Sequence, residues 1–114
     1  MSHFKRLPEF EKEFQKLQKR YRSLPDDLEK FQKILEIDST GVGKNFTITY
    51  HSHKCKIVKG RLACESLRNR SMRVIYAYHD DTVDFVYIEL YFKGDKANED
   101  RERVRQYLKN VEKN

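Results

Sequence analysis

The sequence predicts an α+β fold in which an N-terminal helical hairpin packs on a small antiparallel sheet of three to five strands, followed by a C-terminal helix. Two amphipathic stretches near the N-terminus, two neighbouring runs rich in Val, Ile, Phe and Tyr, and a third amphipathic stretch at the C-terminus predict this order. The chain has 114 residues, so residues 1–114 are expected to form a single domain with one core. We expect the helices to cover one face of the sheet.

The first predicted helix covers residues 8–22. It begins at Pro8, whose missing N–H costs nothing in a first helical turn. Its apolar residues recur at three- and four-residue steps, as in an amphipathic helix: Leu7, Phe10, Phe14, Leu17 and Tyr21.

After a break at residues 23–25, a second helix is predicted to end near Ile37. Four apolar residues are expected to face inward: Leu28, Phe31, Ile34 and Leu35. Because the link between the two helices is short, they should form an antiparallel hairpin.

The middle of the chain is predicted to form the sheet. Residues 38–45 are expected to be a loop, and residues 46–50 are typical of a single strand. Further strands are predicted over residues 62–67, 72–79 and 83–93, and the last two should form a hairpin across a polar turn. Both faces of this hairpin carry apolar residues. One face should cover helices, and the other should be lined partly by aromatic and cationic side chains.

A third helix is predicted over residues 98–111, with Asn98 as its N-cap. Glu99 and Asp100 would then lie in the first turn, where the helix dipole favours negative charge. The apolar stripe of this helix follows i, i+3, i+4, i+7 spacing: Val104, Tyr107, Leu108 and Val111.

Positive charge is concentrated in one part of the chain. Residues 44–73 contain eight Lys and Arg residues and one acid, Glu65, which gives +7. The whole chain carries only +6, so the remaining residues sum to −1. Like charges repel in a compact protein, so this segment is unlikely to serve folding. It predicts a surface for phosphates or for a strongly acidic partner.

No apolar run approaches the ~20 residues needed to cross a bilayer, and the N-terminus has no hydrophobic stretch of the signal-peptide type. We therefore expect a soluble cytoplasmic protein with no membrane partner. In that compartment Cys55 and Cys64 are expected to be reduced thiols.

Residues 41–44 (Gly-Val-Gly-Lys) invite comparison with a phosphate-binding loop. Such a loop needs a further Gly and a Ser or Thr where this chain has Asp38 and Asn45. The segment is interpreted as a loop with two glycines, and no cofactor is expected.

A tetrahedral metal site could in principle be drawn from four residues: His51, His53, Cys55 and Cys64. Structural zinc sites usually supply ligands in close pairs, and this spacing lacks them. The alternative interpretation is two polar histidines at a strand edge and two buried thiols, and we expect no metal.

Two other residue types carry possible chemistry. Glu65 could act as a general base, or it could pair with a neighbouring Arg. Four tyrosines could stack on bases, although most are expected to be core residues: Tyr76, Tyr78, Tyr87 and Tyr91.

Five segments, in this order, resemble the RelE/ParE superfamily of bacterial toxins from type II toxin–antitoxin systems. They are Phe10-Glu-Lys-Glu-Phe-Gln-Lys-Leu17, Tyr21-Arg-Ser-Leu-Pro-Asp-Asp-Leu28, Ile57-Val-Lys-Gly-Arg-Leu62, Met72-Arg-Val-Ile-Tyr-Ala-Tyr78 and Ile88-Glu-Leu-Tyr-Phe-Lys93. The resemblance spans nearly the whole chain, and the Arg-Val-Ile-Tyr strand is its best local mark.

The resemblance implies a toxin that is neutralised by an antitoxin whose tail wraps its surface. Many members are ribosome-dependent mRNA endonucleases that need no metal, because the ribose 2′-hydroxyl attacks the adjacent phosphate. The alternative is a non-enzymatic member, either a DNA gyrase inhibitor like the ParE branch or a catalytically inactive nucleic-acid-binding protein.

By position, Arg68 and Arg73 match the family's phosphate-contacting arginines, and Lys93 stands where an Arg is often found. Many nucleases of the family carry a Tyr or His near the C-terminus as an acid or stacking group. This chain has a charged helix there instead, so Tyr91 and Glu65 are the substitutes proposed for that role. Five further cations of the basic segment are candidates for RNA binding: Lys54, Lys56, Lys59, Arg61 and Arg70.

Overall fold

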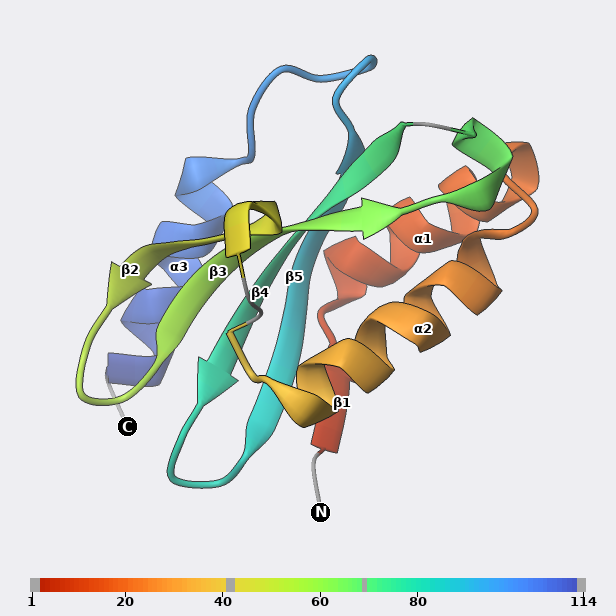
Figure 1. Ribbon diagram of the computed structural model, residues 1–114. Helices are drawn as coiled ribbons and strands as arrows, with labels where there is room; N and C mark the ends of the chain where they lie inside the picture. The colour runs from red at the N-terminus through yellow and green to blue at the C-terminus, as the bar shows by residue number, and fades with distance from the viewer. Residues whose placement is uncertain (1–2, 41–42, 69, 113–114) are drawn as a thin grey trace.

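The computed structural model describes residues 3–40, 43–68 and 70–112. In chain order the elements are β1 (His3–Arg6), α1 (Pro8–Arg20), α2 (Leu24–Ile37), the 3-10 helix η1 (Gly43–Asn45), β2 (Phe46–His51), β3 (Lys56–Ala63), the 3-10 helix η2 (Glu65–Leu67), β4 (Ser71–His79), β5 (Asp84–Phe92) and α3 (Arg101–Glu112) (Figure 1). Gly41 and Val42 of the candidate phosphate loop lie outside the described residues.

The sheet has five strands in the order β1-β5-β4-β3-β2. The pairs β2–β3, β3–β4 and β4–β5 are antiparallel, as predicted, but β1 runs parallel to β5, so the sheet is mixed. Three of the four residues of β1 are exposed, and for that reason the segment has no strong apolar pattern in the sequence. Its main anchor is Phe4, whose ring stacks on Phe85 with centroids 4.5 Å apart.

The strand predictions are confirmed for β2, β4 and β5. The strand predicted over residues 62–67 is right for residues 62 and 63, which end β3, and wrong for the rest. In the structure, strand β3 covers residues 56–63, and residues 65–67 form the 3-10 helix η2. The basic residues of β3 concealed its alternation. Ile57, Val58, Gly60 and Leu62 are buried, whereas Arg61 is exposed.

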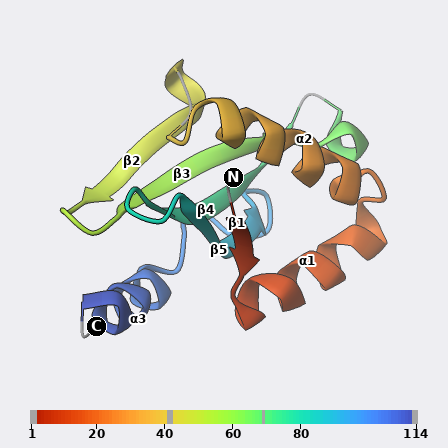
Figure 2. The same ribbon diagram turned by 90° about the horizontal axis from the view of Figure 1, so that it is seen from below.

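The helices lie on both faces of the sheet, so the prediction that they share one face is wrong. In Figure 2, α3 lies on one side of the sheet and α1 and α2 on the other. Side chains such as Val58 and Val74 point from the sheet toward α1 and α2, whereas Ile57 and Ile75 point toward α3. A sheet that is apolar on both faces requires cover on both.

The helical hairpin of α1 and α2 is confirmed, with small differences. Helix α1 ends at Arg20 rather than residue 22, because the backbone of Tyr21, with φ −122° and ψ 90°, is not helical and caps the helix. Ile34 is 49% exposed, so the prediction that it faces inward is wrong. Gly60 lets α2 approach the sheet, since a Cβ there would come within 3.0 Å of the Phe31 ring.

Helix α3 begins at Arg101, later than predicted. Its N-cap is Asp100 and not Asn98, because Asp100 Oδ1 accepts a hydrogen bond from the backbone N–H of Arg103 at 3.1 Å. Val104 and the other apolar residues of this helix are only half-buried.

Polar contacts fix α3 to the rest of the protein. Arg103 donates two hydrogen bonds of 2.9 Å to the carboxylate of Glu13 on α1, and a third of 2.9 Å to the carbonyl oxygen of Ile88. The same carboxylate accepts a 3.1 Å hydrogen bond from the backbone N–H of Leu90. One ion pair therefore connects α1, β5 and α3.

Cys55 and Cys64 are both free and buried, as expected for reduced thiols. Within the described part of the chain, none of the helices is both long and apolar enough to span a membrane.

Candidate nucleic-acid interface

Strand register places two arginines and a tyrosine side by side. Arg61 on β3 lies opposite Arg73 on β4, which lies opposite Tyr91 on β5. Like charges directly opposite each other destabilise a sheet. Burial, and then the charge of Arg61, lower the pKa of Arg73. The pair therefore carries an electrostatic cost that a bound anion would relieve.

These arginines open into a hollow of about 420 Å³, which we call the basic hollow. It is lined by Arg61, Arg70, Ser71, Arg73, Phe92, Lys93 and Gly94. Four of these seven residues are cations and none is an acid. The lining also includes the aromatic ring of Phe92. The guanidinium of Arg70 lies 5.4 Å from the centroid of this ring, close enough for a cation–π interaction.

Arg73 is held in place by its neighbour Ser71. Its Nη1 donates to Ser71 Oγ at 2.9 Å and to the Ser71 carbonyl oxygen at 3.3 Å. These contacts orient the guanidinium without neutralising it. Its other N–H groups remain available for an anion.

Among the described residues, the four cations of the basic hollow form no ion pair. Cations elsewhere in the basic segment do: Lys59 pairs with Glu99 at 3.1 Å, and Lys56 pairs with Asp80 at 3.6 Å. Three unpaired cations of the segment, Arg61, Arg70 and Arg73, thus line the basic hollow. Three others that form no ion pair among the described residues lie outside it: Lys44, Lys54 and Arg68.

Arg68 and Glu65 lie elsewhere, in a hollow of about 560 Å³ beside α2 that shares only Arg61 with the basic hollow. Arg68 follows η2 with a positive φ of 58°. The backbone N–H of Glu65 donates to the buried carboxylate of Asp27 at 3.2 Å. Of the three predicted phosphate-contacting residues, the structure brings together Arg73 and Lys93 and sets Arg68 apart.

Tyr91 lies next to Arg73 in the sheet, but its hydroxyl is buried, has no hydrogen-bond partner among the described residues, and does not line the basic hollow. Its ring lies 5.5 Å from the ammonium of Lys96. Burial disfavours the Lys59 ammonium, yet Glu99 and the nearby Tyr91 hydroxyl outweigh this effect, so the pKa of Lys59 is raised. In this position Tyr91 contacts the ammonium of Lys96 through its ring, and its hydroxyl presents no proton to the basic hollow.

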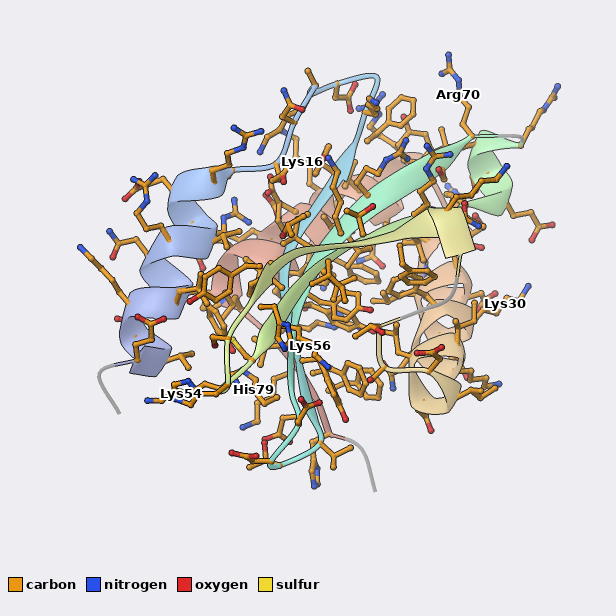
Figure 3. The ribbon with its side chains drawn as sticks, turned by 60° about the vertical axis from the view of Figure 1, so that its left-hand side comes forward. Lys16, Lys30, Lys54, Lys56, Arg70 and His79 are labelled. Carbon is orange, nitrogen blue, oxygen red and sulfur yellow. The ribbon has the colours of Figure 1, made fainter. Side chains whose placement is uncertain are left out.

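Two other predicted RNA-binding residues lie away from the basic hollow. Lys54 is in the turn between β2 and β3, and Lys56 begins β3. Figure 3 shows Lys54 and Arg70 at opposite ends of the molecule. Arg61, by contrast, lines both hollows, and only the strand register reveals this central position.

The four residues considered for a metal site do not converge. Cys55 lies in the core between the sheet and α3, whereas Cys64 lies in the core on the side of α1 and α2. His51 and His53 are exposed near the β2–β3 turn. Among the described residues, no group of three or more His, Cys, Asp or Glu side chains could hold a metal ion.

The arrangement of helices and strands has a counterpart among solved structures. A chain in the crystal structure of an archaeal RelE–RelB complex from Pyrococcus horikoshii OT3 superposes with a TM-score of 0.63, and the match covers 82% of this chain and 96% of that one. This protein has a RelE-like fold. The sequence identity of the RelE-like match is 19%, so the likeness concerns the fold alone. No protein-family model matches the sequence, and no curated protein matches it significantly.

Proposed function

We propose that this RelE-like protein is the toxin of a type II toxin–antitoxin system and that it cleaves mRNA at the basic hollow. The observation that carries the proposal is the gathering of four unpaired cations around one hollow without an acid among its lining residues. Phosphate is the anion that such a cluster fits best, and the RelE-like fold supports RNA as its source.

In the proposed reaction the ribose 2′-hydroxyl attacks the adjacent phosphorus, and the bond from phosphorus to the 5′-oxygen of the next nucleotide breaks. Negative charge accumulates on the pentacoordinate phosphate. Arg61, Arg73 and Lys93 would stabilise that charge, and Ser71 holds Arg73 in place beforehand. No metal takes part in this scheme.

The proposed contribution of the protein is charge stabilisation rather than a strong general base. Neither a carboxylate nor a histidine lines the basic hollow. Such a site needs its substrate held in line for attack, which is consistent with a nuclease that works on ribosome-bound mRNA.

The proposed partner is a cognate antitoxin with an acidic or amphipathic segment. The solved neighbour is a complex of RelE with RelB. A net charge of +6, concentrated in one segment, would attract a partner of opposite charge and speed its association.

A second candidate function is a non-enzymatic toxin, such as a gyrase inhibitor or a catalytically inactive nucleic-acid-binding member. One observation favours it: the Tyr91 hydroxyl is buried, and Glu65 lies outside the basic hollow, so neither proposed proton donor reaches a phosphate bound there.

The test is induction of the chain in a host lacking its antitoxin, followed by primer extension on mRNA and a supercoiling assay for gyrase. We expect discrete mRNA cuts and unchanged gyrase activity. Arg73→Ala should lower the cleavage rate roughly a hundred- to thousand-fold, the equivalent of about 2.7–4 kcal/mol of lost transition-state stabilisation.

Two variants sharpen this test. Arg105→Ala, which removes an exposed arginine on α3, should cut like the parent. Arg68→Ala should reduce cleavage less than Arg73→Ala does, and the reverse order would place the site in the hollow beside α2. Intact mRNA together with inhibited gyrase would overturn the nuclease proposal.

A further inference from the structure

The basic hollow continues into a second hollow of about 330 Å³, which we call the flanking hollow. Arg61, Arg73 and Lys93 line both, so the two hollows adjoin each other. The remaining walls of the flanking hollow come from three parts of the chain: Lys44, Asn45, Thr47 and Thr49 from η1 and β2, Lys59 and Gly60 from β3, and Asn98, Glu99 and Arg101 from the segment that leads into α3.

The flanking hollow adds its own positive charge. Lys44 and Arg101 both line it, and neither forms an ion pair within the described part of the chain. Its one carboxylate, Glu99, is occupied by Lys59 at 3.1 Å. Two cations without an ion-pair partner in the described structure therefore lie beyond the three that the hollows share, although the charge of Arg101 also helps to lower the pKa of Glu99.

The flanking hollow also presents amide side chains, which the basic hollow lacks. Asn45 and Asn98 are both exposed, and no hydrogen bond engages their side chains in the described structure. An amide offers both a donor and an acceptor, the pattern that pairs with base edges. Bases of single-stranded RNA expose these edges, whereas paired bases do not.

The wall that carries Asn98 and Arg101 is anchored to the sheet. Glu89 on β5 is fully buried and accepts a 2.7 Å hydrogen bond from the backbone N–H of Asp100. The same carboxylate pairs with Lys96. The segment is therefore held in position before any ligand binds.

We propose that the flanking hollow is a second nucleotide subsite, in which Lys44 and Arg101 hold a second backbone phosphate and Asn45 and Asn98 contact the base of that nucleotide. Phosphate contacts position a nucleic acid and base contacts specify its sequence. The flanking hollow would accordingly set the sequence preference of the chain. This inference rests on the proposed function, in that the basic hollow takes the first phosphate.

The first test is the affinity for fluorescein-labelled oligoribonucleotides that are 2′-O-methylated throughout, so that they cannot be cleaved. We expect the parent to bind a tetranucleotide clearly more tightly than a dinucleotide. In the double variant Lys44→Ala/Arg101→Ala this gain should disappear. The slope of log affinity against log salt should also fall in magnitude by about 0.7 per cation removed, the value for single strands. Glu99→Gln should bind the tetranucleotide more tightly than the parent.

The matched control is Lys12→Ala/Arg105→Ala, which removes one exposed lysine from α1 and one exposed arginine from α3 outside both hollows. It should bind like the parent. An equal loss in the control, or a parent that binds both lengths equally, would overturn the proposal.

The second test is base preference. Tetranucleotides that differ at one position should bind the parent with different affinities, and Asn45→Ala/Asn98→Ala should bind them alike while keeping the length dependence. Discrimination that survives in this variant would overturn the assignment of the two amides.

The proposal of a second nucleotide subsite and the proposal of RNA cleavage can be refuted independently of each other. If the chain cuts no RNA but the length dependence still requires Lys44 and Arg101, the subsite stands without the nuclease. If Arg73→Ala abolishes cleavage while the double variant binds and cuts like the parent, the nuclease stands without the subsite.

Discussion

At the scale of residues, the protonation states around the two hollows predict how cleavage should depend on pH. Burial raises the pKa of Glu99, but hydrogen bonds from its own backbone N–H and from Lys59 lower it further, so the net shift is downward from 4.5. The pKa of Lys59 is shifted upward from 10.5. Both groups therefore stay charged between about pH 5.5 and 8.5.

In the proposed cleavage, neither a histidine nor a carboxylate of the basic hollow can act as the base, so hydroxide or water would accept the proton of the 2′-hydroxyl. The single-turnover cleavage rate should consequently rise steadily across this pH range. A bell-shaped profile with an inflection near 6.5 would instead indicate a histidine or another group that acts as a general base.

Two buried tyrosines allow a matched comparison. The hydroxyls of Tyr91 and Tyr87 are both buried without a hydrogen-bond partner among the described residues. Replacing either with Phe removes an unsatisfied polar group, so the free energy of unfolding should stay the same or rise by up to about 1 kcal/mol. Urea unfolding would measure it. Cleavage should be unaffected by Tyr87→Phe, and a large loss in Tyr91→Phe alone would show that its hydroxyl reaches the substrate during turnover.

The candidate site could be predicted only in part from the sequence. The local charge excess correctly indicated a basic surface, and Arg73 and Lys93 lie together as their positions in the last two strands suggested. Arg68 lies only five residues before Arg73, yet it lines another hollow, because η2 turns the chain toward α2. The central position of Arg61 depends on the register of β3 against β4, which composition does not determine.

At the scale of elements, the ion pair between α1 and α3 predicts a stability difference. Arg103 is 17% exposed and makes three hydrogen bonds to Glu13 and to the Ile88 carbonyl. Arg103→Ala should lower the free energy of unfolding by about 2–3 kcal/mol, since charged hydrogen bonds are lost and Glu13 keeps only its contact with Leu90. Chemical denaturation would measure this change.

Arg105→Ala is the matched control for this prediction. Arg105 lies two residues further along α3, and its pair with Glu102 is exposed, so its removal should change stability by less than about 0.5 kcal/mol. Equal effects of the two variants would contradict the connecting role of Arg103.

The predictability of the elements follows their apolar patterns. Helices α1, α2 and α3 have clear apolar stripes, so their existence was predictable and only their ends were not. The β4–β5 hairpin is likewise evident from its Val, Ile, Phe and Tyr content. Strand β1 could not be predicted because it is mostly exposed and gains its pairing from β5, far away in the sequence.

At the scale of the whole molecule, net charge predicts how association depends on salt. The chain carries +6, and the cations of the basic hollow form no ion pair with any residue that the structure describes. Association with an acidic antitoxin segment should therefore slow and weaken as salt rises from 50 to 500 mM, because screening shortens the reach of the field. Stopped-flow kinetics would measure the association rate. A rate independent of salt would point to an apolar interface instead.

The ion pair between Glu13 and Arg103 has a further consequence for the solution behaviour of the protein. Strand β1 pairs with only the first half of β5, up to Tyr87, so the second half is an edge of the sheet. An open edge of this kind, rich in apolar residues, invites strands of other molecules to add to it. Here the Ile88 carbonyl and the Leu90 N–H are already bonded by Arg103 and Glu13. The side chains of Arg103 and Glu13 thus occupy backbone groups to which an added strand would bind. This disfavours aggregation through the open part of β5.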